Sequence, residues 1–114
     1  MIKRGEIYFV DLTPTVGREQ TGKRPVLVIS SNSINRLPLV VSVVAGTKGE
    51  NITADYPTNV RILPQESGLS IETVFMCFQI RALDQTRFPE RAAGRVSVEI
   101  MEKIEDSIRY CLEL

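Results

Sequence analysis

Short apolar runs separated by polar turns occupy most of this 114-residue chain. The runs are rich in β-branched and aromatic residues or alternate polar with apolar positions, and both patterns are typical of β-strands. Strands are therefore predicted at residues 6–12, 24–31, 39–45, 58–62 and 73–83, the last as one long strand or a bent pair. Residues 32–36 are expected to form a turn or a short helix, and residues 46–51 are expected to break the third strand.

The hydrophobic period changes near the C-terminus. Apolar residues recur there at helical spacing, at Met101, Ile104, Ile108, Cys111 and Leu112. Ser97 is a suitable N-cap for this helix, and Glu99 in its first turn complements the helix dipole. Several short strands followed by one amphipathic helix predict a mainly β fold, with the helix packed on a small barrel or curled sheet, as one domain over residues 1–114.

The composition is that of an ordinary globular domain, with 43% hydrophobic and 25% charged residues. No run of about 18 apolar residues predicts a membrane span, and the N-terminus lacks the apolar core of a signal peptide. We therefore expect a cytoplasmic protein with no membrane contact. Cys77 and Cys111 are isolated and lack metal-type spacing, so they are expected to be buried, reduced thiols.

The net charge of zero conceals an asymmetry along the chain. Residues 1–48 carry seven Lys or Arg against three Asp or Glu, whereas residues 49–114 carry seven against eleven. This distribution permits a basic face, although a mixed solvated surface is the simpler interpretation. Because the chain contains no histidine, a histidine acid–base pair, a serine triad with histidine and a histidine-ligated metal are excluded. We predict no metal site and no cofactor.

The segment 16–30 is the most informative part of the sequence, because a polar loop with two glycines leads directly into an apolar strand. Gly17 and Gly22 are expected to let the backbone turn where side chains would clash. Pro25 biases Arg24 toward an extended conformation, so the arginine is held at the rigid start of a strand. Its planar guanidinium matches two phosphate oxygens, which makes Arg24 either a phosphate-binding residue or an ordinary surface arginine.

Three further places could supply catalytic or binding groups. Thr47 directly follows an apolar strand, where functional side chains are often found, although the pattern alone favours a simple turn. Glu19, in the glycine-flanked loop, could be a general base or only an ion-pair partner of the nearby arginine. Gln79 could contact a base edge or a backbone, and Arg81 could extend a phosphate-binding surface or be a surface cation.

Together these motifs resemble the MazF/PemK family of toxin endoribonucleases. The matching motifs cover nearly the whole chain in the same order: residues 4–8, residues 17–31 with the core Glu19-Gln20-x-Gly22-x-Arg24-Pro25, the strand ending in Thr47, Gly68-Leu69, Gln79-Ile80-Arg81 and the C-terminal helix. The resemblance implies a small SH3-like barrel that forms a homodimer. It also implies cleavage of single-stranded RNA, often mRNA, at short sequences and without a metal.

The resemblance also implies roles for single residues. The family's catalytic arginine and threonine correspond to Arg24 and Thr47, and Glu19 is our candidate general base because it is the only carboxylate in the first loop. Some family members use a histidine in that loop, and a mechanism through that group is excluded here. The family's RNA contacts correspond to Arg18, Glu19, Gln20 and Gln79, and we expect Lys23, Lys48 and Arg81 to contact RNA as well. Because a chain of zero net charge must cluster its basic groups to bind RNA, we further hypothesise that Arg18, Lys23, Arg24 and Lys48 line one groove, partly shared across a dimer.

A MazE-like antitoxin is the protein partner that the resemblance implies. An acidic, largely disordered tail of that partner would compete with RNA for the basic groove. Two other functions stay open. A gyrase-poisoning toxin of the same fold relies on a C-terminal tryptophan, whereas this chain ends Cys111-Leu112-Glu113-Leu114, and a non-catalytic SH3-like binding module would need no reactive residues.

Overall fold

Six strands form one antiparallel sheet in the computed structural model, which describes residues 1–114. The strand order across the sheet is β4-β5-β3-β2-β1-β6. The strands are β1 Glu6–Asp11, β2 Lys23–Val28, β3 Val40–Lys48, β4 Asn59–Ile62, β5 Thr73–Asp84 and β6 Gly94–Arg95. The helices are α1 Asn32–Asn35, α2 Pro64–Ser67 and α3 Val98–Leu112, with the 3-10 turns η1 Gly49–Asn51 and η2 Gln85–Arg87.

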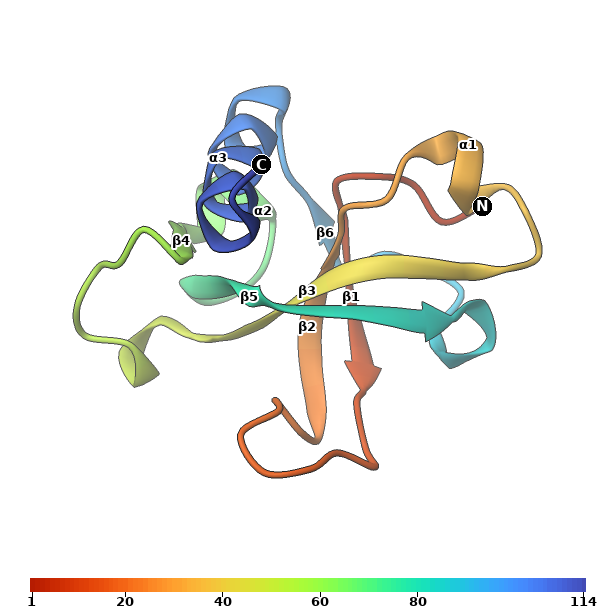
Figure 1. Ribbon diagram of the computed structural model, residues 1–114, viewed down its shortest axis with the longest axis horizontal. Coiled ribbons are helices and arrows are strands. Elements are labelled where there is room, and N and C mark those ends of the chain that lie inside the picture. The colour runs from red at the N-terminus through yellow and green to blue at the C-terminus, as the bar shows by residue number, and fades with distance from the viewer.

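The sheet is strongly curled, because β3 and β5 run across the direction of β1 and β2 (Figure 1). Its two edges, β4 and β6, do not pair, so the strands form a half-barrel. The short helix α2, which follows β4, contacts β6 across the gap. A side chain on Gly94 would collide there with the backbone of Ser67, so this approach requires glycine. The predicted mainly β fold with a C-terminal helix is thus confirmed, with the barrel open on one side.

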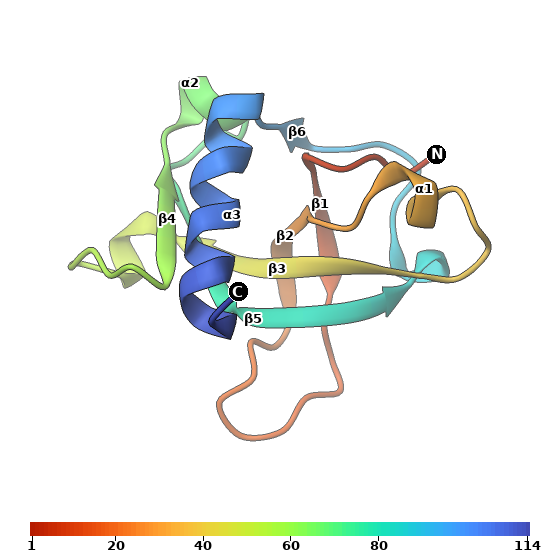
Figure 2. The same cartoon turned by 45° about the horizontal axis from the view of Figure 1, so that its top comes forward.

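Apolar residues pack on both faces of the sheet. In β2, Val26 and Val28 belong to one apolar cluster and Leu27 to the other, so this strand is buried on both sides. The helix α3 covers the cluster that contains Leu27 and packs against β4 and β5 (Figure 2). Ser97 Oγ accepts a hydrogen bond from the backbone N–H of Ile100 at 3.2 Å, which confirms the predicted N-cap. No helix has both the length and the apolar character needed to cross a membrane.

The break predicted at residues 46–51 begins later than the sequence suggests. β3 continues through Gly46 and Thr47 to Lys48, and the chain turns only at Gly49. Gly46 lies opposite Phe75 in the sheet, and a Cβ on Gly46 would be 2.8 Å from the Phe75 ring. This glycine therefore serves to let an aromatic ring pack against the strand, rather than to end it. As a result, Thr47 is a strand residue and not a loop residue.

The long strand β5 is bent, as one of the two predicted alternatives proposed. Val44 pairs with Ile80, but the next residue of β3, Ala45, pairs with Met76. Residues 77–79 of β5 are therefore extra and form a bulge, which bends the strand and changes where its side chains point. Just after the bend, Gln79 and Arg81 hydrogen-bond the backbone of the loop between β1 and β2.

The two cysteines are free thiols, as predicted. Cys77 is fully buried, and burial raises the pKa of its thiol to about 11. Cys111 on α3 is partly buried, and burial also raises its pKa. Both side chains are therefore uncharged at neutral pH and serve as small apolar groups at the contact of α3 with the sheet.

Candidate functional site

Arg24 and Thr47 meet where β2 begins and β3 ends. Val26 is paired with Ala45, and continuing this antiparallel register by two residues places Arg24 opposite Thr47. The two side chains are in contact, with 3.4 Å between Arg24 Nη1 and Thr47 Oγ1. Thr47 is only 5% exposed and Arg24 is half-buried, so both groups are held by packed strands. The sequence predicted both residues, and the structure brings them together.

The positive charge of Arg24 is not neutralised within the chain. Its Nε donates to the carbonyl oxygen of Thr21 at 2.9 Å, and no carboxylate lies within ion-pair distance of its guanidinium. By contrast, Arg4 and Arg61 are both paired with acidic side chains. An unpaired, half-buried guanidinium fixed by a backbone carbonyl is well suited to bind an anion.

Asn51 is a third member of this site that the sequence reasoning missed. Its Nδ2 donates a hydrogen bond to Thr47 Oγ1 at 2.9 Å. Asn51 ends the η1 turn that directly follows β3. The sequence signal for Asn51 is its spacing of four residues from Thr47 across a tight turn. This signal was missed because residues 46–51 were expected to form one break after the strand.

The first loop, residues 13–22, is closed by a backbone hydrogen bond of 2.9 Å from Leu12 to Gly22. Glu19 lies within it, and Glu19 Oε1 accepts a hydrogen bond from the backbone N–H of Val16 at 2.6 Å. Glu19 forms no ion pair with Arg24, which leaves the general-base interpretation of this carboxylate as the one to test.

Two glycines shape this loop, but not for the predicted reason. Gly17 and Gly22 adopt φ values of +56° and +77°, which other residues rarely adopt. A Cβ on either residue would meet no atom within 4 Å, so the predicted side-chain clash is wrong. It is the left-handed backbone itself that requires glycine at both positions.

Gln79 and Arg81 hold the first loop against the sheet. Gln79 Oε1 accepts from the backbone N–H of Gln20 at 3.3 Å, and Gln79 Nε2 donates to the carbonyl oxygen of Arg18 at 3.2 Å. Arg81 Nη1 donates to the carbonyl oxygen of Leu12 at 2.9 Å, at the base of the loop. Both residues, predicted as RNA contacts, bind the backbone of this chain in the free protein. The side-chain Oε1 of Gln20 is buried and accepts no hydrogen bond.

The remaining predicted cations occupy separate places. Lys23 lies opposite Asp11 in the β1–β2 ladder. The pKa of Asp11 is lowered mainly by hydrogen bonds from Thr13, with smaller contributions from the charges of Arg87 and Lys23. The side chain of Arg18 is exposed on the first loop.

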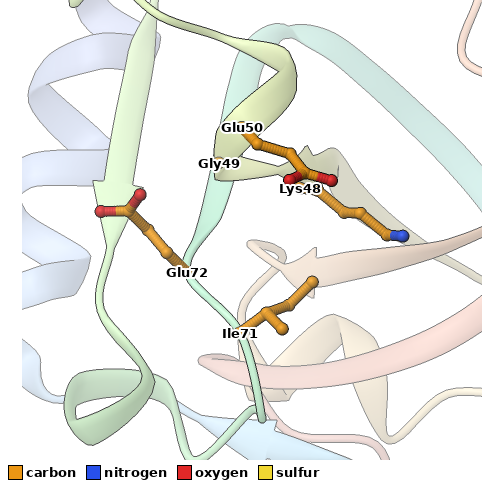
Figure 3. A pocket seen from close by; sticks show the side chains of 5 residues that line it. All are labelled: Lys48, Gly49, Glu50, Ile71 and Glu72. Atoms are coloured by element: carbon orange, nitrogen blue, oxygen red, sulfur yellow. The ribbon is translucent and has the colours of Figure 1, made fainter.

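Lys48 lines a pocket of about 280 Å³ formed with Gly49, Glu50, Ile71 and Glu72 (Figure 3). Because successive residues of a strand point to opposite faces, Lys48 does not share the face of Thr47. The structure therefore joins Arg24 with Thr47 but shows no contact from Lys48 to that pair. Nowhere do three or more His, Cys, Asp or Glu side chains gather in a way that could hold a metal ion.

Comparison with known proteins shows which family this chain belongs to. Residues 3–112 match the family described as PemK-like, MazF-like toxin of type II toxin–antitoxin system. The chain belongs to this family. The curated protein named Endoribonuclease EndoA from Bacillus subtilis strain 168 is 35% identical over 114 residues, which cover 100% of this chain and 97% of the relative.

Solved structures of this family share the fold. An endoribonuclease in complex with its cognate antitoxin, from a mycobacterial species, has a TM-score of 0.80 and 25% identity, covering 100% of this chain and 97% of that one. MazF from Deinococcus radiodurans has a TM-score of 0.79 and 22% identity, covering 99% and 97%. MazE–MazF from the same organism has a TM-score of 0.74 and 21% identity, with the same coverage. The MazF-like fold is thereby confirmed.

Proposed function

We propose that this protein is a sequence-specific, metal-independent endoribonuclease that cleaves single-stranded RNA, chiefly mRNA, and so inhibits translation and growth. The observation that carries the proposal is the unpaired Arg24 guanidinium lying 3.4 Å from the Thr47 hydroxyl at the joined ends of two strands. The 35% identical relative named an endoribonuclease supports the same class of reaction.

In the proposed reaction the RNA 2′-oxygen attacks the adjacent phosphorus. A 2′-O–P bond forms, the P–O5′ bond breaks, and the leaving 5′-oxygen takes a proton from water, so that the products carry a 2′,3′-cyclic phosphate and a 5′-hydroxyl. Arg24 stabilises the negative charge that develops on the phosphorane oxygens, because a preformed cation there needs no reorganisation. Thr47 donates a hydrogen bond to a non-bridging oxygen and thereby holds the phosphate for in-line attack.

Glu19 is the proposed general base that takes the proton of the 2′-hydroxyl. The hydrogen bond from Val16 occupies Oε1 and orients the carboxylate. Glu19 Oε2 accepts no hydrogen bond in the chain and is the oxygen available to the substrate. To act as the base, Glu19 must come within hydrogen-bond distance of the 2′-hydroxyl of the bound RNA. Movement of the first loop on binding would provide this approach.

RNA recognition is proposed to come from the first loop and its supports. Single-stranded RNA is read through splayed bases whose edges accept and donate hydrogen bonds. Arg18, Gln20 and Lys23 are exposed or partly exposed and are the proposed contacts, together with Gln79 and Arg81 where they border the loop. Lys48, which points to the other face of β3 from Thr47, is proposed as a separate contact outside this surface. A homodimer would extend this surface, and an acidic MazE-like antitoxin would cover it, as the antitoxin complexes among the similar structures suggest.

The test is incubation of the purified protein with a mixed-sequence RNA in excess chelator, followed by analysis of the fragment ends. We expect cleavage at a short recurring sequence, cyclic phosphate ends, and complete resistance of a substrate with 2′-deoxyribose at the cleaved position. Fragments with 3′-hydroxyl and 5′-phosphate ends would contradict attack by the 2′-hydroxyl. Binding without cleavage would favour the binding module, and trapping of gyrase on DNA would favour the other toxin class.

A further inference from the structure

The hydroxyl of Thr47 is oriented by two donors. A threonine hydroxyl has two acceptor lone pairs and one proton to donate. Asn51 Nδ2 lies 2.9 Å and Arg24 Nη1 lies 3.4 Å from Thr47 Oγ1, and both groups can only donate. The two lone pairs are thereby used, and the hydroxyl proton has no acceptor within the chain. Thr47 is therefore prepared to donate a hydrogen bond outward.

Asn51 is exposed, so packing does not fix its side chain. Its position depends instead on the turn that carries it. One side chain from the neighbouring strand β4 fixes this turn at both ends. Arg61 Nη1 donates to the carbonyl oxygen of Gly49 at 3.1 Å, and Arg61 Nη2 donates to the carbonyl oxygen of Ile52. These two carbonyls flank Asn51, so a single guanidinium determines where the asparagine lies.

Arg61 is itself held by two carboxylates. Arg61 Nη1 lies 3.3 Å from Glu72 Oε2, and Arg61 Nε lies 3.2 Å from Asp55 Oδ1. Figure 3 shows the Glu72 carboxylate on the opposite side of the pocket from the Lys48 ammonium. Asp55 is 87% exposed and Glu72 only 39%, so Glu72 is the stronger of the two restraints.

A side chain at the start of the turn would push the Glu72 carboxylate away from its place beside Arg61. A Cβ on Gly49 would lie 2.6 Å from Glu72 Oε2 and 3.1 Å from Arg61 Nη1. The backbone N–H of Gly49 also donates to the carbonyl oxygen of Glu72 at 2.9 Å. The turn that carries Asn51 is thus held in place by contacts with β4 and with Glu72, the residue before β5.

We infer that Asn51 and Arg61 are positioning residues for RNA cleavage: Arg61 fixes the turn, and Asn51 directs the Thr47 hydroxyl proton toward the scissile phosphate. The inference rests on the proposed function, since it gives Thr47 a donor role in that reaction. Neither residue need touch the reacting atoms, so each acts on the chemical step more than on RNA affinity.

The experiment is a double-mutant cycle in kcat on a short RNA with one cleavage site, using wild type, Asn51→Ala, Thr47→Val and the double variant. Asn51→Ala is expected to lower kcat about three- to tenfold, as loss of one hydrogen bond predicts, with KM nearly unchanged. In the Thr47→Val background it should have no further effect, because the hydroxyl it orients is absent. Glu50→Ala, an exposed change in the same turn, is the matched control and should behave as wild type.

Arg61→Ala should reproduce the kcat loss of Asn51→Ala, and Arg61→Lys should not restore it, because an ammonium cannot bridge the two carbonyls in one plane. If Arg61→Ala does not fold, as judged by circular dichroism, the Asn51→Ala cycle alone decides. An unchanged kcat for Asn51→Ala, a change in KM only, or an equal loss in the Thr47→Val background would overturn the inference while leaving RNA cleavage standing. A wild-type protein that does not cleave RNA would overturn both.

Discussion

At the scale of single residues, the proposed chemistry depends on which atoms of the site remain free. Arg24 uses Nε on the Thr21 carbonyl and Nη1 on Thr47, so Nη2 has no partner in the chain. The hydroxyl of Thr47 has its proton free. Two donors from neighbouring strands therefore lie side by side, with 3.4 Å between Arg24 Nη1 and Thr47 Oγ1, and donors placed in advance are what an anionic phosphorane requires.

The hydroxyl of Thr47, rather than its shape, is expected to matter. Thr47→Val keeps the volume but removes the donor, and it should slow cleavage on the order of 10-fold to 100-fold, whereas Thr47→Ser should keep part of the activity. Single-turnover rates on a defined RNA measure both variants. If the valine variant cleaves as fast as wild type, Thr47 is only a packed strand residue.

The base role of Glu19 predicts a change in pH dependence. A general base must be deprotonated to work, so protonation of this carboxylate in acid should slow the wild type. Glu19→Gln removes this group and should flatten the acidic limb of the pH–rate profile while lowering the plateau. A profile that keeps its acidic limb in the variant would assign the base to another residue.

At the scale of elements, the site depends on a strand that continues through a glycine and on a strand with a bulge. The order and type of the main strands could be predicted, since Val26, Leu27 and their neighbours carry an unmistakable pattern. The end of β3 could not be predicted, because the glycine at position 46 is explained only by its contact with the ring of Phe75, which is distant in sequence. Local pattern carries no information on such contacts.

The supports of the site were hidden for the same reason. Arg24 and Thr47 stand out through their motifs, but Asn51 and Arg61 act through a turn whose geometry depends on β4 and β5. The strand β6 and the one-turn helix α2 are too short to give a hydrophobic period. What sequence reasoning recovers is therefore the residue types for the chemistry, and what it misses is how they are held.

The bulge in β5 predicts a distinct effect of Gln79. Gln79→Ala removes two hydrogen bonds to the first loop, so the loop should become more mobile. We expect faster backbone hydrogen exchange over residues 13–22 and a KM for RNA raised about three- to tenfold, with kcat largely kept. Gln65→Ala, an exposed glutamine on α2, is the matched control. Unchanged exchange in the loop would show that Gln79 does not hold it.

At the scale of the whole molecule, the chain has zero net charge and must concentrate its cations to bind RNA. Arg24 supplies one unpaired charge at the site, and exposed charges are added by Arg18 on the first loop and Lys23 at the start of β2. An acidic antitoxin would draw on the same groups. Both partners should then respond alike to ionic strength and to charge reversal.

Charge reversal at Arg18 or Lys23 is expected to weaken RNA and antitoxin binding together. Affinities are measured by fluorescence anisotropy with a non-cleavable 2′-O-methyl RNA and with an acidic MazE-like antitoxin, over a range of salt concentrations. Arg91→Glu is the control for a change of net charge alone. Antitoxin binding that survives Arg18→Glu, Lys23→Glu and high salt, while RNA binding fails, would place the inhibitory contact elsewhere, such as on an apolar surface.

The cleavage rate of Arg24→Ala in excess chelator shows directly whether the Arg24–Thr47 pair performs RNA cleavage. Loss of a preformed charge on the transition state predicts a rate lower by on the order of 10² to 10³, with the circular dichroism spectrum unchanged. Arg24→Lys should also be slow because the planar fork is lost, whereas Arg91→Ala should cleave as wild type does. Near-normal cleavage by Arg24→Ala would show that the Arg24–Thr47 pair does not catalyse the reaction.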